Sequence, residues 1–181
     1  MKPSIKFKTA TLPLLITLAL LALSAAIRAS CHDGCDSVLQ NTFLGENALP
    51  NSNGMPAGDT ALGDHALFSV FGGRYNTAVG ADALYNLFDN DENSAAGYQA
   101  AFNDFGDGNT AVGAYAFFAG GAGPFEGYNT ATGYSALKSS RGSYNTASGA
   151  FALANDSSQE SNYNTATGAY ALENNAGSDN T

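Results

Sequence analysis

One nine-residue phrase, N-T-A-x-G-x-x-A-L, recurs eight times along this chain of 181 residues. Successive copies start 16–20 residues apart, so the phrase keeps its length while the spacer between copies varies. A repeat of this size is typical of a solenoid, in which each copy forms one coil and buries its apolar side against its neighbours. The copies start at Asn41, Asp59, Asn76, Asn93, Asn109, Asn129, Asn145 and Asn164.

The phrase favours β-structure over helix. No stretch after residue 40 repeats apolar residues at helical spacing over the length that a stable helix needs. Each copy predicts a short strand, a tight turn at the Gly, a second short strand at A-L and a polar loop. We therefore expect an all-β fold, a β-solenoid of about eight coils. The array spans residues 41–181 and stops inside a ninth phrase, which predicts a fragment of a longer protein.

Two positions of the phrase predict a structural frame. The fifth is Gly in all eight copies, which implies positive φ or a neighbouring backbone too close for a Cβ. The first is Asn in seven copies, and stacked Asn side chains can satisfy the amide of the next coil or a turn carbonyl. The predicted frame residues include Gly80, Gly113, Gly133, Gly149, Gly168, Asn76, Asn129 and Asn164.

Leu occupies the ninth position in six copies and supplies most of the apolar volume. Because a coil lined by Ala and Gly has little core of its own, we expect the Leu column to form an exposed stripe that other chains cover. Tyrosines precede four of the Asn residues, and we favour stacking within the chain over ligand contact for them: Tyr75, Tyr128, Tyr144 and Tyr163. Binding residues, if any, should lie on the turn where the copies differ, as Asp64, Tyr98 and Tyr134 do.

Residues 1–29 have the pattern of a signal peptide. Three lysines precede an apolar run at 12–27, which is short for a membrane span, and small residues follow it. An uncleaved N-terminal anchor is one alternative, and a lipoprotein acylated at Cys31 is a weaker one, because Arg28 stands where a small or apolar residue is usual. Residues 30–40 form a short segment with Cys31 and Cys35, for which a local disulfide is the default in an exported chain. With His32 and Asp33 these cysteines would make only a poor metal site.

Composition and charge exclude several functions. Without residues 1–29 the chain keeps three basic residues against 16 acidic ones, a net charge of −13, which disfavours nucleic acid and anionic lipid as partners. The repeat array is not expected to insert into a membrane. It holds one histidine, His65, and no set of residues for nucleophilic or acid–base catalysis. We expect no enzyme activity, no cofactor and no metal.

The phrases N-T-A-V-G-A-D-A-L (76–84), N-T-A-V-G-A-Y-A-F (109–117) and N-T-A-T-G-Y-S-A-L (129–137) resemble the head repeats of YadA-like trimeric autotransporter adhesins. The likeness covers residues 41–181. It implies a left-handed parallel β-roll, three chains in one head, and attachment to a host matrix or cell surface. The period is longer than that family's, and no coiled-coil stalk or C-terminal barrel anchor is present in the sequence. A Gram-negative outer-membrane location is expected if such an anchor exists.

Other structural proteins share parts of this pattern. An ice-binding solenoid would display Thr-x-Thr in register, which Thr130/Thr132 and Thr165/Thr167 fit and Val79 and Val112 do not. A curli-like subunit would carry regular Gln ladders, which are missing here. A tail-fibre-like repeat spacer is the remaining alternative. An exported surface adhesin or fibre module accounts best for the sequence.

Overall fold

The computed structural model describes residues 34–36, 40–51, 57–104, 106–119, 127–155 and 161–181. The chain divides into two units, residues 1–33 and 34–181, and only the second is described. The predicted signal peptide at 1–29 and the Cys31–Cys35 pair lie outside the described residues, except for the backbone of Cys35. Within the described residues there is no helix, and therefore none that is long and apolar enough to cross a membrane.

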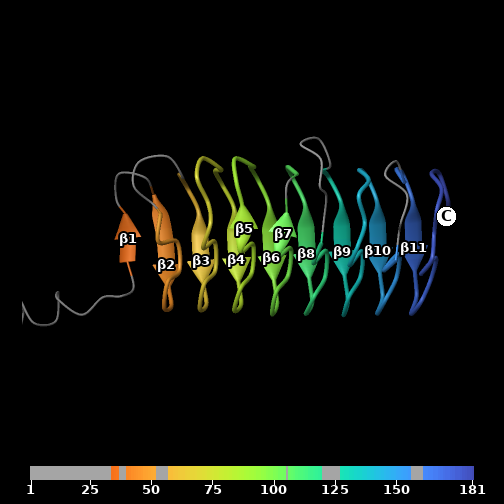
Figure 1. Ribbon diagram of the computed structural model, residues 1–181, viewed down its shortest axis with the longest axis horizontal. Helices are drawn as coiled ribbons and strands as arrows, with labels where there is room; N and C mark the ends of the chain where they lie inside the picture. The colour runs from red at the N-terminus through yellow and green to blue at the C-terminus, as the bar shows by residue number, and fades with distance from the viewer. Residues whose placement is uncertain (1–33, 37–39, 52–56, 105, 120–126, 156–160) are drawn as a thin grey trace, which may run out of the picture. The chain divides into compact units, whose positions relative to one another are not determined.

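The predicted all-β parallel solenoid is confirmed (Figure 1). In the described part of the chain, each of the eight phrases supplies one strand, and these strands pair in parallel with their phrase positions in register. The strands are β2 (Asn41–Leu44), β3 (Thr60–Leu62), β4 (Thr77–Val79), β6 (Ser94–Ala96), β8 (Thr110–Val112), β9 (Thr130–Thr132), β10 (Thr146–Ser148) and β11 (Thr165–Thr167). At the N-terminal end of this sheet, β1 (Gly34–Asp36) pairs antiparallel with β2.

The expected second strand in each coil is wrong for most coils. Only β5 (Asn86–Leu87) and β7 (Asn103–Asp104) form a second parallel pair among the described residues. Elsewhere the x-x-A-L segment is a turn in which alternate residues have positive φ, such as 55° at Asn47 and 47° at Leu49. Its backbone still bonds to both neighbouring coils. In the second copy, Leu67 N–H donates to the Ala83 carbonyl of the next coil at 3.0 Å, and His65 N–H donates to the Glu46 carbonyl of the previous coil at 2.9 Å. The repeated turn replaces a strand without losing these hydrogen bonds.

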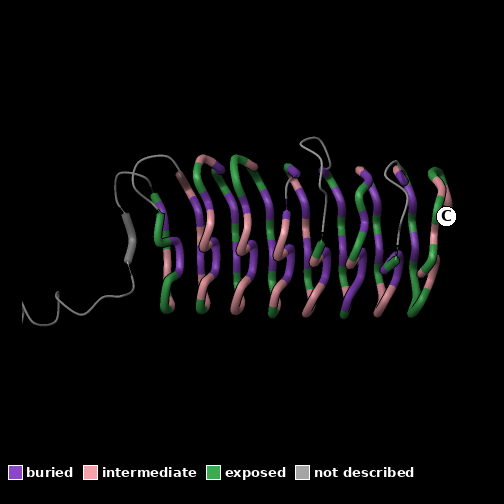
Figure 2. Tube along the Cα trace, viewed as in Figure 1, coloured by how far each residue is buried: buried purple, intermediate pink, exposed green. Residues whose placement is uncertain are grey.

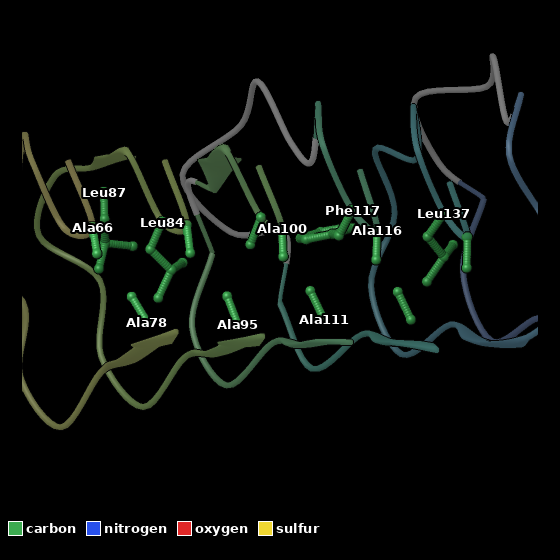
Figure 3. Packing of buried hydrophobic residues seen from close by; sticks show 14 of the residues in the cluster. Ala66, Ala78, Leu84, Leu87, Ala95, Ala100, Ala111, Ala116, Phe117 and Leu137 are labelled. Atoms are coloured by element: carbon green, nitrogen blue, oxygen red, sulfur yellow. The ribbon is translucent and has the colours of Figure 1, made fainter. Parts of the chain in front are cut away.

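The core lies inside the coils, between the strands and the turns (Figure 2). The strand alanines Ala78 and Ala111 point toward Leu84 and Phe117 of the facing segment (Figure 3). This corrects the expected exposed Leu stripe: Leu137 is fully buried, as are the equivalent side chains of the other coils, except the half-buried Leu172 of the last one. The reason is the positive φ at this position, which turns the side chain inward.

Candidate functional site

The glycine column fixes how closely the coils stack. All eight frame glycines have φ between 120° and 141° (Gly168 the smallest, Gly97 the largest). A methyl group added at Gly133 would lie 2.6 Å from the Gly149 carbonyl oxygen, and Gly45, Gly63, Gly80, Gly97, Gly113 and Gly149 meet the next coil in the same way. Such contacts are too short for any side chain, and the φ values disfavour one as well. Gly168 differs, since a methyl group there would meet nothing within 4 Å.

The first residues of the phrases form a buried ladder. Each Oδ1 accepts a hydrogen bond from the backbone N–H of the equivalent residue one coil on, at 2.7–3.0 Å from Asn41 to Asn180. In four coils the amide Nδ2 donates to the carbonyl three residues before the next ladder position, as Asn129 does to Gly142 at 2.9 Å. In these coils one side chain therefore satisfies both a backbone N–H of the ladder and a backbone carbonyl of the adjacent loop, which stabilises the buried turn.

Two buried carboxyl groups interrupt this amide pattern. Asp59 stands in the ladder itself, where its Oδ1 accepts from the Asn76 N–H at 2.7 Å. Asp104 accepts from the Gly106 N–H at 3.0 Å and from Asn109 Nδ2 at 2.9 Å. The second oxygen of each is buried without a hydrogen-bond partner among the described residues. Burial raises the pKa of Asp59 to about 6 and that of Asp104 to about 7, against the hydrogen bonds that lower it.

A column of tyrosines beside the ladder is stacked in parallel, which confirms the expected stacking within the chain for Tyr128, Tyr144 and Tyr163. For Tyr75 it stays a prediction. Ring centroids lie 5.3 Å apart between Tyr128 and Tyr144 and 5.1 Å apart between Tyr144 and Tyr163, with interplanar angles of 10° and 2°. We name Tyr128, Tyr144 and Tyr163 the stacked edge. Each ring is at least half exposed, and Tyr144 is stacked between the other two rings.

The turn after the frame glycine carries a second row of aromatic rings, and here the contacts are edge to face. Tyr115 meets Tyr98 at 5.4 Å and 89°, and Tyr134 at 5.8 Å and 80°. Tyr134 meets Phe151 at 5.3 Å and 69°. We name Tyr98, Tyr115 and Tyr134 the turn row. Of the sequence-predicted turn residues, Tyr98 and Tyr134 come together here, whereas Asp64 lies in an earlier coil beside His65 Nδ1 at 2.8 Å.

Sequence reasoning missed Tyr115 and Phe151 as parts of this row. The signal was available, because the sixth position is Tyr98 and Tyr134 in alternate copies, with Ala114 and Ala150 between and after them. From the fourth copy on, the seventh position carries a ring wherever the sixth does not, at Tyr115, Phe151 and Tyr170. Between Tyr98 and Phe151 the rings therefore alternate between two neighbouring columns rather than repeat in one.

The outer face of the main sheet carries two further columns. The second position of the phrase is Thr in seven copies and Ser94 in one, and none of these side chains is buried. The fourth position is also not buried, but it changes from aliphatic to hydroxyl along the axis. It is Leu44, Leu62, Val79, Ala96 and Val112 in the first five copies, then Thr132, Ser148 and Thr167.

No group of three His, Cys, Asp or Glu side chains in the described part of the chain could hold a metal ion. A shallow hollow of about 260 Å³ is lined by Phe71, Gly72, Phe88 and Asp89, where the two phenylalanine rings stack at 5.9 Å. No protein-family model, curated protein or solved structure matches the chain.

Proposed function

We propose that this chain is an exported, non-enzymatic surface module, an adhesin head or fibre that attaches to host or environmental surfaces through many weak contacts. The observation that carries the proposal is the register of the strands, which sets equivalent outward-facing residues at one rung spacing after another. Parallel strands lie about 4.8 Å apart, so contacts repeat at that interval along the face. Repeated weak contacts raise the overall affinity without a deep pocket.

Adhesion by the exported chain tests this function. Beads coated with the chain should bind to an extracellular-matrix or cell-layer surface, and the bound number should rise steeply with coating density because the contacts are multivalent. Beads coated with an unrelated acidic protein serve as the control. Equal retention of both kinds of bead would contradict the proposal. Mass spectrometry of the secreted chain should show an N-terminus near residue 30, as expected for cleavage of a signal peptide.

The same proposal includes a homotrimer of left-handed β-rolls, as the family resemblance implies. Since the Leu column is buried, another surface must hold the chains together. The outer sheet face supports such contact, because Leu44, Val79 and Val112 are 51 %, 40 % and 44 % exposed and no charged residue stands in either of its columns. Burying an exposed aliphatic side chain stabilises by about 1.5–3 kcal/mol when burial is complete.

Sedimentation of a double variant tests the trimer. Val79→Asp with Val112→Asp should convert a trimer into monomers, because it introduces unpaired negative charges into an apolar contact. Thr132→Asp with Thr167→Asp is the matched control on the hydroxyl part of the face and should have a smaller effect. A wild-type chain that sediments as a monomer would contradict the trimer but leave adhesion by a monomeric solenoid open to its own test.

Ice binding is a second candidate, favoured by the in-register column of exposed threonines on the sheet face. The aliphatic residues of the fourth position interrupt the Thr-x-Thr array in the first five copies. An assay of ice recrystallisation decides between the two candidates. Inhibition that disappears in Thr130→Lys with Thr146→Lys would favour ice binding over adhesion.

A further inference from the structure

We propose that the turn row is a binding platform for neutral polysaccharide, with sugar rings lying against the exposed rings of Tyr98 and Tyr134. This inference names the ligand class of the proposed adhesin and therefore rests on the proposed function. Three observations carry it: the orientation of the rings, the lack of charged side chains at the sixth and seventh phrase positions from Tyr98 on, and the alternation of tyrosine with alanine.

Ring orientation in the turn row covers less aromatic face than a parallel stack would. A parallel stack covers one face of both rings in each pair, whereas an edge-to-face contact covers a face of only one. Tyr115 makes edge-to-face contacts with both Tyr98 and Tyr134, which are 46 % and 50 % exposed. The face of an aromatic ring is its electron-rich part, so it attracts the C–H groups that line one side of a sugar ring.

Tyr115 holds the two outer rings apart and is not itself expected to stack on the ligand. Lys138 Nζ lies 5.9 Å from the centroid of its ring, a cation–π distance. Its pKa is raised by partial desolvation, by the neighbouring tyrosines and by a hydrogen bond with Tyr98. Tyr115 is therefore a positioning residue, and Tyr98 and Tyr134 are the candidate binding residues.

The charge of this stretch suits a neutral ligand. From Tyr98 to Tyr170 the sixth and seventh positions of the phrase hold no charged side chain, although the chain has 16 acidic residues. In the first three copies the same two positions include Glu46, Asp64 and Asp82. An anionic polysaccharide would be repelled by the chain as a whole. A basic protein would be drawn to the acidic coils rather than to this uncharged stretch.

The spacing of the rings suits an extended polymer. Tyr98 and Tyr134 occupy the same phrase position two rungs apart, which is about 9.6 Å along the axis, with Ala114 between them. Tyr170 continues the aromatic turn two rungs further and is 59 % exposed. Because both the solenoid and a polysaccharide repeat along their length, successive sugars can meet successive rings, and the contacts add through avidity.

Co-sedimentation with insoluble cellulose and chitin tests the platform, using the full chain and alginate as an acidic probe. We expect wild type to bind one of the neutral polymers. Tyr98→Ala with Tyr134→Ala should weaken binding at least about tenfold, or about 1.4 kcal/mol. Alanine already stands at this position in Ala81, Ala114, Ala150 and Ala169, so the substitutions fit the local fold. Tyr144→Ala with Tyr163→Ala, on the stacked edge, is the matched control and should leave binding within about twofold.

Four outcomes would overturn the inference: no binding of wild type to either neutral polymer, binding to alginate alone, equal loss in both double variants, or no loss in either. Circular dichroism of each variant identifies any that fails to fold, and Tyr98→Leu with Tyr134→Leu then replaces it, keeping bulk while removing the ring. A wild-type chain that adheres to a protein matrix but not to these polymers would refute the platform while supporting adhesion. Failure in both assays would refute the proposed function as well.

Discussion

The stacked edge and the turn row are built from the same residue type, yet their rings are used differently. On the stacked edge, Tyr144 and Tyr163 are parallel to within 2°. In the turn row, Tyr98 and Tyr115 are at 89°. The difference follows from the phrase position: rings that repeat at one position in consecutive coils stack, and rings that alternate between two positions meet edge to face.

Other aromatic contacts obey the same rule. Phe68, Tyr85, Phe102 and Phe118 share the tenth position in four consecutive coils, and their rings stack within 15° of parallel. Phe151 and Tyr170 share the seventh position in consecutive coils and stack at 9°. Tyr134 and Phe151 occupy different positions and meet at 69°. In this solenoid, the phrase positions that aromatic residues occupy in consecutive coils therefore decide whether their rings stack in parallel or meet edge to face.

The stacked edge and the turn row both depend on a constant spacing between coils. Substituting a frame glycine should therefore have the largest effect on stability. Gly133→Ala places a methyl group 2.6 Å from the Gly149 carbonyl oxygen at a φ of 132°, and should lower the free energy of unfolding by about 3 kcal/mol. Gly168→Ala has the strained φ but no close atom and should cost about 1 kcal/mol. Urea unfolding measures both. Equal losses would mean that strain alone, without the close approach, accounts for the glycine column.

The effect of Asp59 on the pH dependence of stability tests the buried ladder, which runs beside the stacked edge. Burial raises the pKa of Asp59 from 3.8 to about 6, so the folded state binds more protons than the unfolded state between these values. Stability is therefore fully present below about pH 4 and falls as the pH rises to about 6, by on the order of 2 kcal/mol. Asp59→Asn supplies the amide found in the rest of the ladder, so above pH 7 it should recover a similar amount and flatten this part of the profile.

Urea unfolding from pH 4 to pH 8 measures this effect. Glu46→Gln, which removes an exposed carboxylate from the neighbouring coil, is the matched control and should change stability by less than about 0.5 kcal/mol. Asp104, with its pKa raised to about 7, should keep part of the pH dependence in Asp59→Asn. A variant no more stable than wild type at pH 8 would show that the ladder tolerates a buried carboxylate without cost.

The repeat alone predicted an all-β solenoid, because a fixed phrase with a Gly in every copy leaves few alternatives to stacked coils. It did not predict that Leu137 points inward, since the letters A-L do not reveal the positive φ of 49° that turns the side chain into the coil. The turn row was only half identified. Tyr98 and Tyr134 stood out by their variability, whereas Tyr115 becomes meaningful only when adjacent coils are placed in register.

Ala114→Tyr should change the edge-to-face contacts of the turn row into a parallel stack. It therefore tests directly whether alternation between two phrase positions causes the edge-to-face geometry. Tyrosine would then occupy the sixth position in three consecutive coils, and Ala114 is only half-buried. We expect parallel stacking, a gain in stability of about 1 kcal/mol and weaker binding to neutral polysaccharide. The chain has nine tyrosines and no tryptophan, so near-UV circular dichroism reports the tyrosine arrangement without interference. An unchanged spectrum with full binding would contradict the rule.

Tyr98→Phe gives the smallest expected effect and separates the hydroxyl from the ring. The ring keeps its edge-to-face contact with Tyr115, so stability should change by less than about 0.5 kcal/mol and polysaccharide binding should persist. The hydrogen bond with Tyr98 contributes to the raised pKa of Tyr115, so the substitution should move that pKa toward its ordinary value. Tyr144→Phe on the stacked edge is the control, because that ring makes no contact with Tyr115 among those described. Spectrophotometric titration of the phenols measures the shift.

A different outcome would contradict the stacking interpretation of the turn row. If both variants leave the Tyr115 titration unchanged while Tyr98→Phe abolishes binding, the hydroxyl of Tyr98 rather than its ring face contacts the ligand.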